Sequence, residues 1–210
     1  MDKLCLIIQG PSNNVNIIKE KYKDCDIQII FSTWEGEENK YDENDIVVFN
    51  KIPQERGVQN VMLQQLSTYN GLLKAKELGF KNAIKIRSDV YFTNLSYFLK
   101  NEIDCNKLNF LFFLNYHRIN GPDKNIDYYK YFCDYIQISS VDNLLKMWNF
   151  KYDICSYSEQ LTTKHIFNTF KKEEISFIGN YLSKDCDIYW ISRNLYLSTL
   201  NSNKSYKIKI

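Results

Sequence analysis

Proline and glycine are scarce in this sequence: its 210 residues include 3 Pro and 7 Gly, and no stretch is rich in either. Linkers and hinges between domains are usually rich in such residues, so nothing in the sequence divides the chain. Internal repeats and low-complexity segments are lacking as well. Because 210 residues suit one domain of ordinary size, we expect residues 1–210 to form a single domain.

Long apolar runs are absent too. A membrane-spanning helix needs about 18 or more predominantly apolar residues, and no run approaches that length. No secretory signal peptide is recognisable. We therefore expect a cytoplasmic protein without a transmembrane segment. The tail that carries Lys204, Lys207 and Lys209 is either a solvated terminus or a contact with anionic lipid headgroups, which leaves peripheral membrane contact open.

Neither sign of charge dominates, because 27 Lys and Arg stand against 25 Asp and Glu, a net charge of +2. Nucleic-acid-binding proteins usually carry a basic block or face, and the sequence shows none. We therefore expect no nucleic-acid partner. Hydrophobic residues make up 44% of the chain and charged residues 25%, a balance typical of a globular protein.

None of the 6 cysteines has the CxxC spacing of zinc and redox sites. Without a secretory signal, and with apolar residues around several of them, we expect all of them to be free thiols. The two histidines, His117 and His165, lie far apart and are weak candidates for metal ligands. GxGxxG, P-loop, HExxH and GxSxG motifs are missing, which argues against NAD enzymes, NTPases, zinc proteases and serine hydrolases.

Short apolar runs alternate with helical segments along the chain. The predicted strands cover residues 3–9, 26–32, 45–50, 82–87, 108–115, 132–138, 175–178 and 188–192. The predicted helices cover residues 12–22, 57–78, 140–149 and 156–171. Strands that alternate with helices favour an α/β fold with a mostly parallel central sheet flanked by helices.

The longest predicted helix, residues 57–78, carries two stripes. The apolar stripe, typical of a helix face packed on a core, consists of Met62, Leu66, Tyr69 and Leu73. The polar stripe beside it consists of Asn60, Gln64 and Ser67, continued by Gly71. Amides donate and accept hydrogen bonds in fixed geometry, so Asn60 and Gln64 can face the hydroxyls of a sugar. Solvent exposure of this stripe is the alternative.

Ligands of open α/β sheets bind at the carboxyl ends of the strands. Three polar or turn-forming stretches follow predicted strands, namely Gln9-Gly10-Pro11, Ser32-Thr33-Trp34-Glu35 and Arg87-Ser88-Asp89. We expect a nucleoside diphosphate at this edge, with its base near the first two stretches and its phosphates near the third. Trp34 can stack on a base or sugar ring, or it can be a buried structural residue.

The third stretch is the most informative. Asp89 follows a predicted buried strand, where a carboxylate can hold Mn²⁺ or Mg²⁺ against diphosphate oxygens. Such an ion neutralises the charge that develops on a nucleotide leaving group. The alternative is that Asp89 is a turn or cap residue. Arg87 can bind a diphosphate through two parallel hydrogen bonds, or it can pair with a neighbouring acid.

Two further acids are candidates for acceptor binding or general-base catalysis. Asp134 lies in the predicted strand 132–138, and Glu159 opens the predicted helix 156–171. For Glu159 a structural explanation is also available, because a negative charge in a first helical turn interacts favourably with the helix dipole.

Several stretches together resemble the WavE lipopolysaccharide-synthesis family. In chain order they are residues 8–11 (IQGP), 32–37 (STWEGE), Asn60 with 64–68 (QQLST), 71–72 (GL), 85–89 (KIRSD), 134–148 and 158–160 (SEQ). The resemblance covers most of the chain. It implies a GT-A-like fold and a glycosyltransferase of surface glycan synthesis, with a nucleotide-sugar donor and a glycan or glycolipid acceptor.

The resemblance also implies that Asp89 takes the place of the last Asp of a DxD metal motif, while Arg87 replaces its first acid. A metal ion is then held by one carboxylate with diphosphate and water, or it is not required. We therefore predict a nucleotide-sugar-dependent glycosyltransferase, assisted by Mn²⁺ or Mg²⁺. A non-catalytic nucleotide- or glycan-binding subunit is one alternative. A sugar nucleotidyltransferase is another, although Gly10-Pro11-Ser12 is a poor version of its Gly-rich basic loop.

Overall fold

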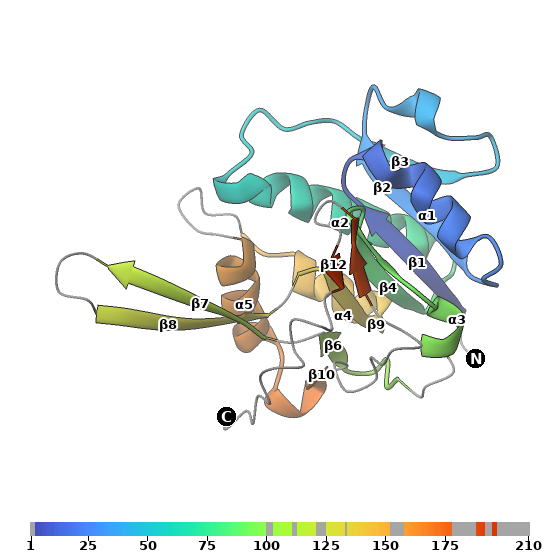
Figure 1. The fold of residues 1–210 in the computed structure, drawn as a ribbon. Helices are drawn as coiled ribbons and strands as arrows, with labels where there is room; N and C mark the ends of the chain where they lie inside the picture. Colours follow the sequence, from blue (N-terminus) through green and yellow to red (C-terminus); the bar gives the residue numbers. More distant parts are fainter. Residues whose placement is uncertain are drawn as a thin grey trace.

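The computed structural model describes residues 3–99, 103–110, 113–120, 125–132, 134–151, 158–177, 188–191 and 195–196. A seven-stranded sheet with the order β10-β6-β9-β4-β1-β2-β3 forms its centre (Figure 1). Its strands are β1 (Leu4–Gln9), β2 (Gln28–Trp34), β3 (Ile46–Asn50), β4 (Asn82–Arg87), β6 (Leu108–Phe110), β9 (Ile136–Ser140) and β10 (Ile175–Phe177). β9 is antiparallel to both of its neighbours, β4 and β6, and the other pairs are parallel. The predicted α/β class with a mostly parallel sheet is confirmed.

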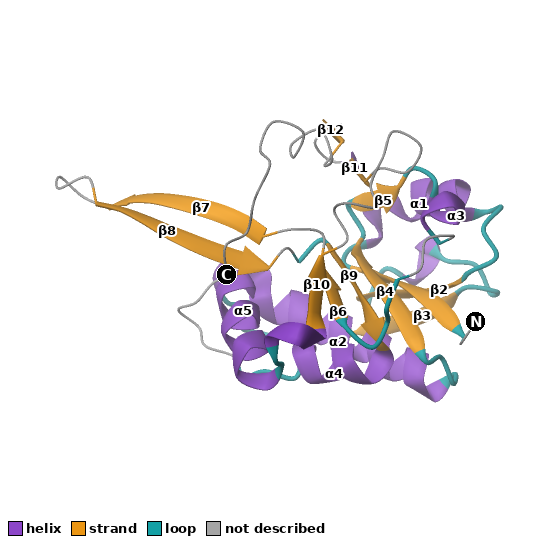
Figure 2. Cartoon of the chain, turned by 90° about the horizontal axis from the view of Figure 1, so that it is seen from below, coloured by secondary structure: helices purple, strands orange, loops and turns teal. Residues whose placement is uncertain are grey.

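Helices cover both faces of this sheet (Figure 2). One face carries α2 (Val61–Glu77), α4 (Val141–Trp148) and α5 (Ser158–Thr169), and the other carries α1 (Val15–Tyr22) and α3 (Leu95–Phe98). The short turns of 3₁₀ helix are η1 (Ser12–Asn14), η2 (Glu38–Lys40), η3 (Val58–Asn60) and η4 (Lys172–Glu174). Alternate residues of β1 divide between two cores, because Leu6 packs with Ile18 of α1 while Ile7 packs with Leu72 of α2.

Two smaller β-structures flank the sheet. β5 (Val90–Phe92), β11 (Ile188–Trp190) and β12 (Leu195–Tyr196) form a three-stranded sheet on the side of α1 and α3 (Figure 2). β7 (Phe113–Asn120) and β8 (Asn125–Phe132) form an antiparallel hairpin that projects from the body (Figure 1). The single strand predicted over 108–115 is thus divided between β6 and β7. The strand predicted over 132–138 begins only at Ile136, because Asp134 is held by contacts outside the sheet.

The buried face of α2 consists mainly of small side chains, both polar and apolar, and it differs from the predicted apolar stripe. Leu73 is 43% exposed, and the buried positions are Val61, Ser67, Thr68, Gly71, Leu72 and Ala75. A Cβ on Gly71 would lie 2.8 Å from Cγ2 of Ile7 and 3.1 Å from Cβ of Ser32. The Ser32 hydroxyl donates a hydrogen bond of 2.6 Å to the carbonyl oxygen of Ser67. Only small side chains permit this close approach.

Cys5 and Cys25 are free thiols, as predicted. Cys133, Cys155 and Cys186 lie outside the described residues. Burial raises the pKa of the Cys5 thiol to about 12. Within the described ranges, no helix combines the length and the apolar composition that crossing a bilayer requires.

Candidate functional site

Several of the predicted site residues lie at one edge of the sheet, where β1 and β4 end side by side. β2 lies beside β1 and β3 lies beside β2, whereas β4, the next strand in the chain, lies on the other side of β1. Such a reversal of strand order leaves a crevice beyond the carboxyl ends of the two strands. Gln9 and Arg87, the last residues of β1 and β4, are neighbours in register. β9 starts at the same edge, since Ile136 pairs with Ile86.

Arg87 lies between two carboxylates at this edge. Its Nε and Nη2 donate hydrogen bonds to the two carboxylate oxygens of Asp89 at 2.9 and 2.7 Å. Its Nη1 lies 3.5 Å from Oδ2 of Asp134. The guanidinium carbon also lies 5.0 Å from the centre of the Tyr135 ring. Of the two interpretations of Arg87, the ion pair with neighbouring acids is the one present in this structure.

Asp134 is the buried member of this group, with 2% of its surface exposed. Its Oδ2 accepts a hydrogen bond from Nε2 of Gln64, so two predicted site residues from distant parts of the chain are in contact. Its backbone carbonyl accepts a hydrogen bond of 2.5 Å from Nζ of Lys85. Lys85 is fully buried and lies 4.9 Å over the ring of Trp148. We call Lys85, Arg87, Asp89 and Asp134 the charged cluster.

The charged cluster balances two cations against two carboxylates. Burial opposes the charged form of Arg87, but the charge of Asp134 and the hydrogen bonds and charge of Asp89 outweigh it and raise the pKa of the guanidinium. Buried charges are tolerated when they are paired and hydrogen-bonded, and removing one partner costs about 3–5 kcal/mol. Lys85 was not predicted as a site residue. A lysine between Ile84 and Ile86 in a buried strand was the available signal.

Backbone contacts fix the turn that carries Asp89. The N–H of Ser88 donates to the carbonyl oxygen of Gln9 at 2.8 Å, and Nδ2 of Asn14 donates to the carbonyl oxygen of Ser88 at 3.0 Å. The N–H of Ile191 donates to the carbonyl oxygen of Asp89 at 2.8 Å. Gly10 has a φ of +123°, and a Cβ there would lie 2.8 Å from the Ser88 hydroxyl oxygen. The turn is therefore held independently of the Asp89 side chain.

Glu37 ties together the loops that follow β1 and β2. Its Oε2 accepts hydrogen bonds from the Ser12 N–H at 3.2 Å, from the Trp34 N–H at 3.4 Å and from the Thr33 hydroxyl. Trp34 is 7% exposed, which favours the structural interpretation of this residue over stacking on a ligand. Glu35 and Pro11 are exposed beside it. Glu37 was missed as a site residue although it ends the STWEGE stretch.

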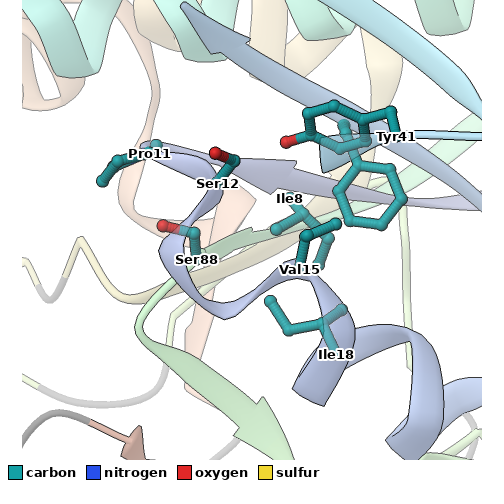
Figure 3. A pocket seen from close by; sticks show the side chains of 9 residues that line it. Ile8, Pro11, Ser12, Val15, Ile18, Tyr41 and Ser88 are labelled. Atoms are coloured by element: carbon teal, nitrogen blue, oxygen red, sulfur yellow. The ribbon is translucent and has the colours of Figure 1, made fainter. Parts of the chain in front are cut away.

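A small pocket lies between the loop after β1 and α1 (Figure 3). Its empty volume is about 180 Å³, including space open to solvent. The lining residues are Ile8, Gly10, Pro11, Ser12, Val15, Ile18, Phe31, Tyr41 and Ser88. Ligand sites usually have about 300–1,000 Å³, so this pocket is too small to enclose a nucleotide sugar.

Three buried polar side-chain atoms have no hydrogen-bond partner within the described structure. They are Oε1 of Gln9, Oγ1 of Thr68 and Oδ1 of Asp134. A buried polar atom without a partner costs about 1–3 kcal/mol, so native proteins contain few of them. Gln9 ends β1, Thr68 lies on the buried face of α2, and Asp134 precedes β9. A bound ligand or ordered water would satisfy them.

The remaining predicted residues lie apart from the charged cluster. Asn60 is exposed at the start of α2, with a left-handed backbone at φ 62°. Glu159 lies in the first turn of α5, and its side chain is outside the described part of the structure. His165 is hydrogen-bonded through Nε2 to the carbonyl oxygen of Lys146 at 2.8 Å. The roles predicted for Asn60 and Glu159 stay predictions.

The charged cluster does not suit a divalent metal ion in this arrangement. Both carboxylate oxygens of Asp89 accept hydrogen bonds from Arg87, and Oδ2 of Asp134 lies near the same guanidinium. Among the described residues, no group of three or more His, Cys, Asp or Glu side chains is placed to hold a metal. A metal ion at Asp89 therefore requires Arg87 to move away.

No protein-family profile and no curated protein matches this sequence. Among solved structures, the chain resembles a protein assigned as a nucleotide-diphospho-sugar transferase from Desulfovibrio desulfuricans G20, with 9% identity over 84% of this chain and 80% of that chain, at a TM-score of 0.52. It also resembles 4-diphosphocytidyl-2C-methyl-D-erythritol synthase, with 10% identity over 94% of this chain and 93% of that chain, at a TM-score of 0.52. At such low identity the likeness shows the fold, which is that of GT-A and nucleotidyltransferase-type proteins.

Proposed function

We propose that this chain is a glycosyltransferase that transfers a sugar from a nucleotide-sugar donor to a glycan or glycolipid acceptor. The observation that carries the proposal is the position of Arg87, whose guanidinium lies in the charged cluster where β1 and β4 end. The fold supports the same proposal, because it is the fold of nucleotide-diphospho-sugar transferases. Residues 1–210 then act as one catalytic domain.

The donor lies across the carboxyl edge of the sheet in this proposal. Its base contacts the loops 9–11 and 33–35, mainly through their backbone, because Trp34 is buried. Its diphosphate reaches Arg87 and Ser88, and its sugar faces Gln64. The unpartnered Oε1 of Gln9 and Oγ1 of Thr68 supply acceptors for donor N–H or O–H groups.

In the transfer step, the bond between the sugar C1 and the β-phosphate oxygen breaks, and its electron pair leaves with the nucleoside diphosphate. The acceptor oxygen bonds to C1 and loses its proton to a base. Arg87 stabilises the negative charge that develops on the leaving diphosphate. Because the Arg87 guanidinium is already held by Asp89, it needs little reorganisation when the charge develops.

Asp134 and Glu159 are the predicted candidates for the general base. Asp134 is buried, and its Oδ2 contacts Gln64 and Arg87. This geometry favours a role for Asp134 in positioning Arg87 over proton abstraction from an acceptor. We therefore keep Glu159, at the start of α5, as the candidate for acceptor binding and base catalysis.

A metal-assisted version of this reaction places Mn²⁺ or Mg²⁺ at Asp89, as the sequence predicts. The metal ion would supply Lewis-acid stabilisation of the leaving diphosphate. For that to happen, Arg87 has to release the Asp89 carboxylate, whose two oxygens it binds at 2.9 and 2.7 Å.

The resemblance to the WavE family supports surface polysaccharide or glycan synthesis as the pathway. A cytoplasmic location, with the donor supplied there and an acceptor that is a glycan or a glycolipid, is part of the same proposal. The Lys-rich tail is compatible with contact with a membrane surface, and it lies outside the described residues.

One observation supports sugar transfer rather than nucleotidyl transfer in this proposal. A nucleotidyltransferase binds phosphates with the backbone of a Gly-rich loop after its first strand. Here the Ser12 N–H in that loop donates to Glu37, so a carboxylate already lies where a phosphate would be bound. A non-catalytic subunit with the same site remains the alternative that the experiment must exclude.

The proposal is tested by incubating the protein with uridine, guanosine and thymidine diphosphate sugars and measuring the nucleoside diphosphate released. Slow release to water, or faster release with a glycan acceptor mixture, is expected for one of them. The Asp89→Ala variant should release less nucleoside diphosphate than wild type. Its matched control is Asp142→Ala, which removes an exposed ion pair with Lys76 of α2. A folded protein that binds a donor but never releases its nucleoside diphosphate would support the non-catalytic subunit.

A further inference from the structure

We infer that Arg87 and Lys85 supply the positive charge that a divalent metal ion supplies in a DxD site, so that the donor diphosphate binds without metal. The inference rests on the proposed function, because it concerns the same diphosphate site. It differs from the metal-assisted version in the cation that meets the phosphates.

The position of Arg87 is the first observation. In a metal site of this kind, a cation lies against a carboxylate at the strand end and faces the diphosphate. Here the guanidinium lies against Asp89 through two hydrogen bonds and reaches Asp134 with Nη1 at 3.5 Å. A metal ion and this guanidinium cannot bind the same two oxygens of Asp89 at once.

The charge balance is the second observation. A divalent ion between two carboxylates gives a neutral centre. Lys85 and Arg87 give the same balance against Asp89 and Asp134, because Lys85 is bonded to the backbone of Asp134 and Arg87 contacts both carboxylates. A divalent ion added to this group would leave a net excess of positive charge in a partly buried site, which the protein would have to stabilise elsewhere.

Rigidity is the third observation. The Arg87 side chain is held by Asp89 on one side and stacks near Tyr135, while its backbone N–H donates to the carbonyl oxygen of Tyr135 at 3.1 Å. The turn of Asp89 is fixed by Gln9, Asn14 and Ile191 through the contacts described above. A guanidinium held in this way binds phosphate oxygens with little loss of side-chain entropy.

The test is isothermal titration calorimetry with UDP, GDP, CDP, ADP and dTDP. Each nucleotide is titrated once in about 1 mM EDTA without metal, and once without EDTA in about 1 mM Mn²⁺. We expect one of these nucleotides to bind wild type with a dissociation constant that changes less than about twofold between the two conditions. If binding depended on the metal, the dissociation constant would change at least about tenfold between the two conditions. Such a change corresponds to about 1.4 kcal/mol in binding free energy, which the titration resolves.

Three substitutions of Arg87 and one control variant test whether this guanidinium is the cation that binds the diphosphate. Arg87→Ala should weaken binding in EDTA at least about tenfold, because a charge-assisted hydrogen bond is lost. Arg87→Lys keeps the charge without the paired geometry, so it should bind with intermediate affinity. Arg87→Asp creates the DxD pattern with Asp89, and its binding should become dependent on Mn²⁺. Lys76→Ala, which removes an exposed ion pair at the far end of α2, should bind like wild type.

The outcomes separate this inference from the proposed function. Binding by wild type only in the presence of Mn²⁺ would overturn the inference and leave the proposed function standing. Metal-free binding that Arg87→Ala does not weaken would also overturn it, because another group would then be the cation. If none of the nucleotides binds in either condition, the proposed function fails and the inference fails with it. Circular dichroism of each variant shows that it is folded, and Arg87→Lys decides the matter if Arg87→Asp does not fold.

Discussion

The backbone N–H of Ser12 donates a hydrogen bond of 3.2 Å to the carboxylate of Glu37. This contact joins the loop after β1 to the loop after β2, which are two of the three strand ends where the donor is proposed to bind. The same carboxylate holds the Thr33 hydroxyl and the Trp34 N–H. Glu37 therefore holds together the two loops of the proposed donor-binding edge, and we assign it no contact with the donor.

Glu37→Ala should lower the free energy of unfolding by about 1–3 kcal/mol, because it leaves buried donors without their acceptor. Nucleotide affinity should fall as well, since the two loops lose their common anchor. Urea denaturation and titration with the nucleotide that binds wild type measure the two effects. Glu38→Ala is the control, because the exposed Glu38 carboxylate accepts a hydrogen bond from the nearby Gly36 N–H at 3.0 Å and does not join the two loops. Equal losses in the two variants would contradict the role given to Glu37.

Asp89→Ala should leave the fold intact and reduce sugar transfer on the order of a thousandfold, equivalent to about 4 kcal/mol. The turn is held through its backbone, whereas the Arg87 guanidinium loses the partner that makes two of its hydrogen bonds. Asp89→Asn should be impaired nearly as much, because the amide lacks the charge. Transfer rates with circular dichroism provide the measurement. Near-normal activity of a folded Asp89→Ala protein would make Asp89 a turn residue only.

Gly71→Ala should destabilise the protein by about 1 kcal/mol, even though alanine is the better helix former. The added Cβ would lie 2.8 Å from Cγ2 of Ile7, so α2 has to move away from the sheet. Such a shift also moves Gln64 relative to Asp134. The urea midpoint should fall, while that of Lys74→Ala, a change in an exposed ion pair on the same helix, should stay near wild type. If Gly71→Ala were more stable than wild type, the side chains of the sheet would have moved to accommodate the added Cβ at little cost, and the prediction would be wrong.

Stability should decline in alkali because of a buried thiol, that of Cys5, and a partly buried phenol, that of Tyr41. Burial raises the pKa of Cys5 from 9.0 to about 12 and that of Tyr41 from 10.0 to about 12. The unfolded chain loses these protons at lower pH than the folded one, so stability present below pH 9 is lost progressively as the pH rises toward 12. Urea midpoints across this range should fall, and Tyr41→Phe should show a shallower decline. A flat profile for wild type would contradict the burial of these groups.

The strands were predictable where burial is complete on both faces. β1 is a continuous apolar run that ends in Gln9, and β4 contains three apolar residues beside Lys85 and ends in Arg87. The predicted limits of both strands agree with the structure within one residue. The core face of α2 was not predictable from hydrophobicity, because close packing on Ile7 and Ser32 demands small side chains such as Gly71. The hairpin of β7 and β8 was missed although Asn120-Gly121 is a common turn pair.

The common location of several candidate residues was predictable, whereas their contacts were less so. The rule that ligands bind at strand ends located Gln9, Arg87 and Asp89 at one edge, and these residues do lie there. Which acid pairs with Arg87 depends on tertiary structure, because Asp134 lies 47 residues further along the chain, just before β9. The buried Lys85 was missed because hydrophobic patterning does not reveal a charge that is paired with a backbone carbonyl.

A crystal structure of the protein with a bound nucleotide sugar would show where the donor lies. We expect the diphosphate at the carboxyl ends of β1 and β4, within hydrogen-bond distance of Arg87, with the base over the loops 9–11 and 33–35. A donor bound elsewhere, for example over α4 and α5 with no phosphate near Arg87, would contradict this expectation.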